Sequence, residues 1–281
     1  PIVPNIGVGE SCLPGLQTFC TAMGLKDSDW MPESNAVYKL GIHHVNWLRE
    51  GSRWRHGFRF NRNDGEDFAW ELNPDGSIPS DNVRYSYHID AIAFGQMLKK
   101  RVGDPLGIKH VVAHIKDAQV DERGYISGVV LESGEVVKSD FYVDCSGMAR
   151  ILGTKVGMTF KPYGNIPNDR AIACPQDSYP TGIHNYTITY AEKAGWIWDT
   201  ALTHRRGCGY TYSSSFTTDE EALETYLKYN PNSDMDKLRV IKFTSHYAEN
   251  PLEKNVLAVG FASGFIEPAG AASPTAIPVI L

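Results

Sequence analysis

The sequence lacks several features that would assign it to a large protein class. Its cysteines show no CxxC spacing, so we expect no zinc site, and their scatter is typical of a reducing cytoplasm. No apolar run approaches the ~20 residues of a membrane-spanning helix. The net charge of −6 gives no electrostatic basis for binding nucleic acid or an anionic membrane. We therefore expect a cytoplasmic protein without a nucleic-acid or membrane partner. The five cysteines are Cys12, Cys20, Cys145, Cys174 and Cys208.

The sequence also lacks a complete GxGxxG dinucleotide fingerprint. Gly7-Val8-Gly9-Glu10 has two of the three glycines and no useful strand before it, so by itself it indicates an ordinary turn rather than a nucleotide site. The chain begins Pro1-Ile2-Val3-Pro4 without Met, and it ends within the apolar segment 278–281. We interpret it as a fragment of a longer protein, truncated at both ends.

The remaining composition is that of a globular protein, with 42% hydrophobic and 21% charged residues in 281 positions. This length predicts one large domain or two closely packed ones. Periodicity and turn signals predict the following elements. A short helix is expected within 12–30, with Gly24 as its stop, and further helices in 88–101 and 218–229, the last with a Thr218/Glu221 capping box. Strands are expected in 36–48, 183–216 and 255–260 and, as a β-meander, in 110–120, 126–131 and 136–143, with a polar excursion over 51–84.

The most informative motif is Gly195-Trp196-Ile197-Trp198-Asp199. In an extended segment Trp196 and Trp198 project to the same face, because strand side chains alternate with period two. Two such side chains form either a hydrophobic core ladder or a broad aromatic wall. The residues alone favour the core ladder.

Lys39 lies among the apolar neighbours of a predicted strand, in the segment Asn35-Ala36-Val37-Tyr38-Lys39. A lysine in that setting either extends its ammonium group to solvent or is held in an apolar place where its pKa falls. The sequence pattern by itself favours the first alternative.

Two predicted strands end in turns made of small residues. Residues 141–144 lead into Cys145-Ser146-Gly147, and residues 255–259 lead into Gly260-Phe261-Ala262-Ser263-Gly264. Small residues let the backbone approach a phosphate group or a ring, and a helix N-terminus after the second turn would favour anions. A tight turn packed against its neighbours is an equal alternative for the second turn, and Asp144 is more plausibly structural than catalytic.

Taken in order, these motifs resemble the flavin-dependent halogenases, in particular the tryptophan halogenase family. The resemblance covers nearly the whole chain. It implies an α/β FAD-binding fold of the flavin-monooxygenase type with an inserted β-rich substrate region. It further implies one domain over 1–281, with flavin-contacting segments at about 1–30, 105–160 and 250–281, and a substrate side at about 161–249.

The resemblance also implies roles for single residues. Lys39 matches the catalytic lysine that guides hypohalous acid to the substrate, and Trp196 and Trp198 match the tryptophans that separate flavin from substrate. The flavin contacts that it implies are Glu10, Ser11, Ile115, Gly260, Ala262 and Gly264. It implies reduced FAD from a separate flavin reductase, O2, chloride or bromide, a small aromatic substrate (tryptophan, indole, pyrrole or phenol) and a possible homodimer.

The sequence departs from the family after Glu267-Pro268. The family continues Leu-Glu-Ser-Thr-Gly, whereas here the second glutamate is replaced by Gly270, and Pro274 removes a backbone donor nearby. His43, His44 and His88 are acid–base candidates, although a structural role fits each better. The alternatives to a halogenase are an FAD-dependent aromatic hydroxylase and a degenerate, non-catalytic flavin-binding protein.

Overall fold

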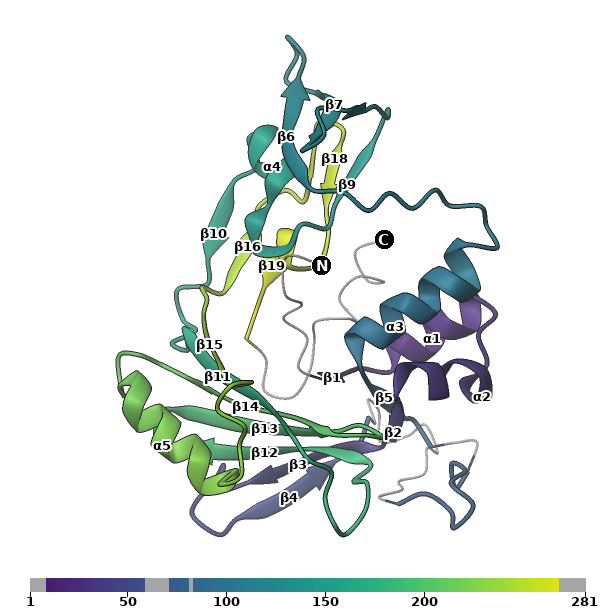
Figure 1. Cartoon of the computed structure of the whole chain (residues 1–281). Coiled ribbons are helices and arrows are strands. Elements are labelled where there is room, and N and C mark those ends of the chain that lie inside the picture. The colour runs from purple at the N-terminus through teal and green to yellow at the C-terminus, as the bar shows by residue number, and fades with distance from the viewer. Residues whose placement is uncertain (1–8, 59–70, 81–82, 268–281) are drawn as a thin grey trace, which may run out of the picture. The chain divides into compact units, whose positions relative to one another are not determined.

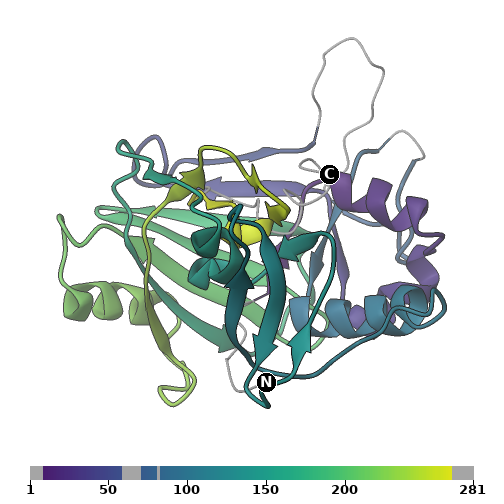
Figure 2. The same cartoon turned by 90° about the horizontal axis from the view of Figure 1, so that it is seen from above.

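A computed structural model describes residues 9–58, 71–80 and 83–267 of the chain. Its described residues form two compact units. The first is built from residues within 1–107 and 167–243, and the second from residues within 108–166 and 244–267. Figures 1 and 2 show the elements of each unit in two orientations. None of the described helices is long and apolar enough to cross a membrane.

The first unit contains a seven-stranded sheet in the order β15-β11-β14-β13-β12-β3-β4. All of its neighbouring strands are antiparallel except β12 and β3, which pair in parallel with Ile42 opposite Thr187. In chain order the strands are β3 (Gly41–Val45), β4 (Arg53–His56), β11 (Arg170–Gln176), β12 (Tyr186–Glu192), β13 (Gly195–Ala201), β14 (Arg206–Tyr212) and β15 (Arg239–Lys242).

The two faces of this sheet have different neighbours. Helix α5 (Asp219–Tyr229) covers one face, where its Ala222 and Tyr226 pack with buried Ile197 and Tyr210 of the sheet (Figure 1). The capping box at Thr218 forms as predicted and satisfies backbone donors at the start of this helix. Since Ile197 faces α5, alternation directs Trp196 and Trp198 to the opposite face.

A smaller sheet of the first unit has the order β1-β5-β2, with β1 (Glu10–Ser11), β5 (Ser86–Ile89) and β2 (Val37–Lys39). Three helices, α1 (Gly15–Ala22), α2 (Asp27–Trp30) and α3 (Ala91–Leu98), share a buried core with it around Trp30 and Tyr87. Their rings pack edge to face at 4.8 Å between centroids. A 3-10 helix, η1 (Pro32–Ser34), follows α2, and a π-helical segment, η2 (Lys99–Gly103), follows α3.

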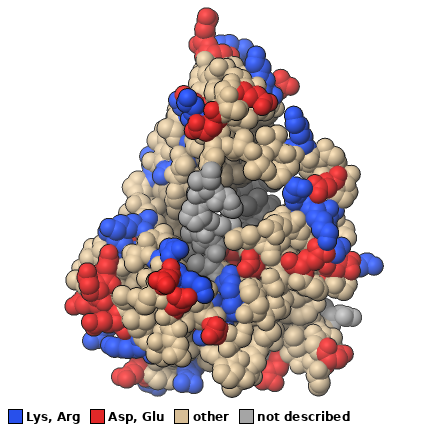
Figure 3. All heavy atoms as spheres, in the orientation of Figure 1, with Lys and Arg blue, Asp and Glu red and all other residues tan. Residues whose placement is uncertain are grey.

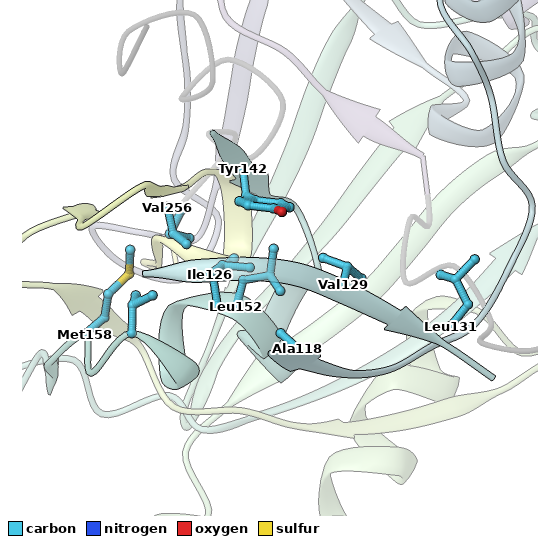
Figure 4. Packing of buried hydrophobic residues seen from close by; sticks show 11 residues of the cluster. Ala118, Ile126, Val129, Leu131, Tyr142, Leu152, Met158 and Val256 are labelled. Carbon is cyan, nitrogen blue, oxygen red and sulfur yellow. The ribbon is translucent and has the colours of Figure 1, made fainter. Parts of the chain in front are cut away.

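The second unit contains three small sheets around its own apolar core (Figure 4). Ile126, Leu152 and Val256 come from different elements and meet in this core. The sheets are β6 (Ile115–Val120), β7 (Ile126–Leu131) and β8 (Val136–Val137); β17 (Leu252–Glu253), β18 (Val256–Ala258) and β9 (Tyr142–Asp144); and β10 (Phe160–Pro162), β16 (His246–Ala248) and β19 (Gly264–Phe265). The remaining elements are η3 (Gly147–Ala149), α4 (Ile151–Lys155) and η4 (Gly260–Ala262).

Several predicted elements are correct in kind but wrong in extent. The strand predicted for 36–48 is two strands, because the chain leaves the small sheet at Leu40 and enters the large one. The helix predicted for 88–101 begins only at Ala91, since His88 belongs to β5 and the Asp90 side chain caps the helix. By contrast, the short helix expected within 12–30 is confirmed as α1, and its predicted stop Gly24 has a left-handed φ of +71°.

The predicted β-meander is correct for β6, β7 and β8 only. Residues 108–114 are exposed and irregular, and β9 pairs with β18 instead of continuing the meander. The polar excursion over 51–84 contains β4, and part of it lies outside the described residues. Gly264 and Phe265 form β19, and the helix expected to follow the segment 260–268 lies outside the described residues. Gly270 and Pro274 also lie outside them.

Candidate active site

Lys39 is fixed where the chain passes from one sheet to the other. The Asn185 side chain donates to the Tyr38 carbonyl at 2.9 Å, and the Leu40 amide donates to the Asn185 carbonyl at 2.7 Å. One residue therefore holds the backbone on both sides of Lys39. As the last residue of β2, Lys39 lies opposite Ser86 of β5, and its side chain is fully buried.

The Lys39 ammonium group is held by neutral oxygen atoms. Its Nζ donates to Ser11 Oγ at 2.7 Å and to the Cys12 carbonyl at 3.1 Å, and it lies 5.2 Å from the centre of the Phe58 ring. Removing an ammonium ion from water costs several kcal/mol, which these contacts offset only in part. Burial accordingly lowers the pKa of Lys39 to about 7. Both the amine and the ammonium form are present near neutral pH.

Two further titratable groups lie on the strands beside Lys39. Burial, assisted by the charge of Asp90, raises the pKa of Glu10 to about 7, although Arg205 opposes this shift. Burial lowers the pKa of His88 to about 3, so its imidazole is neutral. Glu10 and His88 belong to paired strands, with Glu10 opposite Ile89 and Ser11 opposite His88. The small sheet thus gathers ionisable groups whose charged forms are all disfavoured.

Trp196 and Trp198 lie on the sheet face opposite α5, with their ring centroids 6.1 Å apart. The Trp198 ring covers Gly209, where an added Cβ would come within 2.2 Å of it. Thr189 lies opposite Trp198 on β12, and Thr187 is two residues away, so all of these side chains share one face. Trp47 extends this aromatic surface, with its ring centroid 6.4 Å from that of Trp196.

His44 adds a second group of rings to the same face. It stacks on Trp54 at 4.0 Å between centroids, and its Nδ1 lies 2.8 Å from Thr189 Oγ1. The indole of Trp47 donates to the same hydroxyl at 2.9 Å. Burial is the main cause that lowers the pKa of His44 to about 4. The Nε2 atom of His44 is buried and has no hydrogen-bond partner among the described residues.

The other predicted flavin contacts belong to the second unit. Ile115 begins β6 and is 41% exposed, whereas Ala262 is fully buried in the core. Gly260 adopts a left-handed φ of +59°, and an added Cβ at Gly264 would lie 3.0 Å from the His246 carbonyl. At these positions the backbone, rather than a side chain, is what a ligand could approach.

The two small-residue turns lie at the carboxyl ends of neighbouring parallel strands. Ala258 of β18 pairs with Asp144 of β9, and the Val259 amide donates to the Asp144 carbonyl at 3.0 Å. The Asp144 carboxylate accepts from the amides of Ser146, Leu152 and Gly153, which gives it the structural role expected. Carboxyl ends of parallel strands are where open α/β sheets bind dinucleotides. The two turns are therefore of the type that can contact an FAD molecule.

The structure brings together some of the predicted site residues. Glu10, Ser11 and Lys39 meet in the small sheet of the first unit, and Ser11 contacts Thr187, on the face that also carries Trp196 and Trp198. Ile115 lies in one sheet of the second unit, and Gly264 in another. Sequence reasoning missed Thr187, although Thr187 and Thr189 at period two within a strand indicated one polar face. No group of three His, Cys, Asp or Glu residues suited to a metal ion occurs in the described ranges.

Comparison with known proteins places this geometry in a family. The family model of tryptophan halogenase matches residues 1–69 and 62–278. Tryptophan 6-halogenase SttH of Streptomyces toxytricini is 29% identical, over 95% of this chain and 61% of the relative. Tryptophan 7-halogenase RebH of Lentzea aerocolonigenes is 28% identical, over 95% of this chain and 60% of the relative.

Solved structures agree with this assignment. BrvH, a flavin-dependent halogenase from Brevundimonas sp. BAL3, superposes with a TM-score of 0.86 at 27% identity, over 97% of this chain and 62% of that one. This chain therefore spans less than two thirds of the length of these relatives. The predicted fold class is confirmed. The chain belongs to the tryptophan halogenase family and has the FAD-binding fold of the flavin-dependent halogenases.

Proposed function

We propose that the protein halogenates an electron-rich aromatic substrate, with reduced FAD, O2 and chloride or bromide, and that Lys39 guides the hypohalous acid to the ring. The observation that carries the proposal is the fully buried Lys39 amine, held by Ser11 and Cys12 with a pKa of about 7. An N–H group so fixed can hold hypohalous acid by a hydrogen bond next to one ring carbon, which converts an unselective oxidant into a directed one.

FAD, when bound, supplies with O2 the oxidising capacity that converts halide to hypohalous acid. We propose that the backbone at Gly260, Ala262 and Gly264 contacts it, since the turn beside β9 offers small residues at the ends of parallel strands. Glu10, Ser11 and Ile115 complete the proposed contacts. The role of Trp196 and Trp198 is to fill the space between cofactor and substrate.

The partners that we propose follow from this chemistry. We propose that a separate flavin reductase delivers the reduced FAD and that the protein acts in the cytoplasm as a homodimer. On the face shown in Figure 3, acidic and basic side chains alternate without a large field of one sign. That face offers no continuous basic surface of the kind that binds nucleic acid.

The deciding experiment is the mass of the product. The protein is incubated with a flavin reductase, FAD, a nicotinamide cofactor, O2 and indole, in chloride and then in bromide. We expect a product whose mass and isotope pattern change with the halide. A hydroxylated product in both salts would support an aromatic hydroxylase instead, and flavin binding without any product would support a non-catalytic protein.

A further inference from the structure

A chain of hydrogen bonds leads from Lys39 and Ser11 to Thr187 and His88, two buried side chains that the proposed reaction does not use. Lys39 Nζ donates to Ser11 Oγ at 2.7 Å, and Ser11 Oγ lies 2.6 Å from Thr187 Oγ1. Thr187 Oγ1 lies 2.9 Å from His88 Nε2, and His88 Nδ1 lies 3.0 Å from the Ala201 carbonyl. The chain joins the small sheet to the large one within the first unit. Its direction decides how Lys39 is held.

The donor and acceptor in each of these hydrogen bonds are determined by starting at the Ala201 carbonyl. The Ala201 carbonyl can only accept, so His88 Nδ1 must carry the proton and donate it. Since burial keeps this imidazole neutral, His88 Nε2 carries a lone pair and must accept. Thr187 therefore gives its single hydroxyl proton to His88 Nε2. Thr187 and His88 are at most 1% exposed, so bulk water does not provide them with alternative partners, whereas Ser11 is half-buried.

The near end of the chain follows from the same count of protons. Because Thr187 has given its proton to His88, it can only accept from Ser11, and the Ser11 hydroxyl must donate to it. Ser11 then presents a lone pair to Lys39 Nζ. The Cys12 carbonyl is an acceptor by nature. The Ser11 hydroxyl and the Cys12 carbonyl thus both accept from Lys39, and neither donates back to it.

We propose that Thr187 and His88 are positioning residues that lock Ser11 as a hydrogen-bond acceptor toward the Lys39 amine. When the amine is neutral, a Ser11 hydroxyl held in this way accepts a proton from it and does not donate to its lone pair. The importance of this lock for catalysis depends on the proposed function, but the lock itself does not. The sequence alone offered no partner for His88, and this proposal gives it a specific role.

The lock is tested by titrating Lys39 itself in the flavin-free protein. Lysine residues are labelled with 15N at Nζ, the Lys39 signal is identified by its loss in Lys39→Met, and its shift is followed with pH. Glu10, Cys12 and His88 are the other titratable groups on the elements beside Lys39. Observation of the lysine signal separates its titration from that of Glu10, which occurs near the same pH.

Thr187→Val removes the acceptor of the Ser11 proton. The serine hydroxyl can then turn and donate to the neutral amine, which favours the uncharged form of Lys39. We expect the pKa of Lys39 to fall by on the order of one unit. Thr187→Ser keeps a hydroxyl and should restore the wild-type titration. If Thr187→Val does not fold, His88→Phe interrupts the chain one step further on, with the same expected shift.

Thr189→Val is the matched control. It lies on the same strand and face, two residues from Thr187, but bonds to Trp47 and His44 instead of Ser11. We expect Lys39 to titrate in it as in the wild type. Equal titration curves for Thr187→Val and Thr189→Val would overturn the lock. A shift confined to Thr187→Val supports it even in a protein that yields no halogenated product, so failure of the proposed function is recognised separately.

Discussion

Ionisable side chains in this protein are buried in forms that ordinary surface residues do not adopt at neutral pH. Lys39 and Glu10 both have a pKa of about 7, one lowered and the other raised by burial. Groups with strongly shifted pKa values concentrate at functional sites, where ionisable side chains are held away from water. Such groups also make stability depend on pH, which provides tests at the level of single residues.

Lys39→Met should separate two steps of the proposed reaction. The lysine would act only after hypohalous acid has formed, so the variant should consume O2 and reduced flavin while losing halogenated product by at least about 100-fold. Product is measured by mass spectrometry and flavin oxidation by absorbance in the same sample. An equal loss of flavin oxidation would place Lys39 at the cofactor instead.

His44 should make the fold sensitive to mild acid. Its folded pKa is about 4, whereas an unfolded histidine has a pKa near 6.5. As the pH falls from about 6.5 to about 4, this histidine binds a proton in the unfolded chain but not in the folded protein, so the free energy of unfolding decreases over that range. In His44→Phe this contribution is absent, while Glu10 contributes equally to both proteins.

The corresponding measurement is urea unfolding of the wild type and His44→Phe between pH 7 and pH 4.5. The variant has a constant disadvantage, because the Thr189 hydroxyl loses an acceptor. We expect the free energy of unfolding to decrease less with falling pH in the variant than in the wild type. Stability curves that remain parallel over this range would contradict a buried, neutral His44.

At the level of elements, the seven-stranded sheet depends on one glycine beneath the aromatic surface. A Cβ at Gly209 would lie 2.2 Å from Trp198 and 2.4 Å from the Ile172 carbonyl on the next strand. Gly209→Ala should therefore displace the Trp198 ring or separate β14 from β11, and lower the free energy of unfolding by about 1–3 kcal/mol. Chemical unfolding followed by tryptophan fluorescence measures both effects.

Gly95→Ala is the control for that substitution. Gly95 is exposed within α3, and an added Cβ would meet nothing within 4 Å. The same change should raise stability by roughly 0.5–1 kcal/mol, because alanine loses less conformational entropy in a helix. If both variants were stabilised, the close packing of Trp198 on Gly209 would be wrong.

The two tryptophans of β13 give another prediction at the level of elements. Replacing both Trp196 and Trp198 by Ala should reduce the yield of halogenated product per flavin oxidised, because the proposed separation between flavin and substrate is lost. A hydroxylated by-product, detected by mass, would support the barrier directly. Unchanged coupling would mean that the two rings serve packing alone, the alternative that the sequence favoured.

Local patterns predicted helix α5 with its cap, the strand of Trp196 and Trp198, and the β6–β8 meander. These depend on residues close in the sequence, such as Thr218 and Glu221. The break at Leu40 could not be predicted, because it is set by Asn185, far along the chain. The burial of Lys39 was likewise invisible to periodicity, and only the family resemblance indicated it. His88 was placed in a helix because its long-range partners were unknown.

At the level of the whole molecule, each of the two units has its own apolar core. The proposed catalytic lysine belongs to the first unit, and the turns at Gly260 and Ala262 belong to the second. The predicted assignment of flavin and substrate sides along the chain stays a prediction.

Substrate choice is a property of the complete catalyst. Gly270 replaces the glutamate that the family pattern carries, and loss of one preorganised charge costs on the order of 2–4 kcal/mol of transition-state stabilisation. Activated rings need less help, so we expect indole, phenol or pyrrole to be used well ahead of tryptophan, and bromide at least as readily as chloride. Competition between equal amounts of tryptophan and indole in each halide measures this, and preferential chlorination of tryptophan would contradict it.

The parallel pairing of β3 with β12 has a consequence for the order in which the protein is made. His44 and its partner Thr189 are 145 positions apart, and Ser11 and Thr187 are 176 apart. At roughly 5–20 residues per second, a ribosome needs about 7–30 s after completing β3 to supply β12. During that interval the nascent chain has no Asn185 to clamp the backbone around Lys39. Until β12 emerges, the surroundings of Lys39 also lack Thr187, so they are completed only late in synthesis.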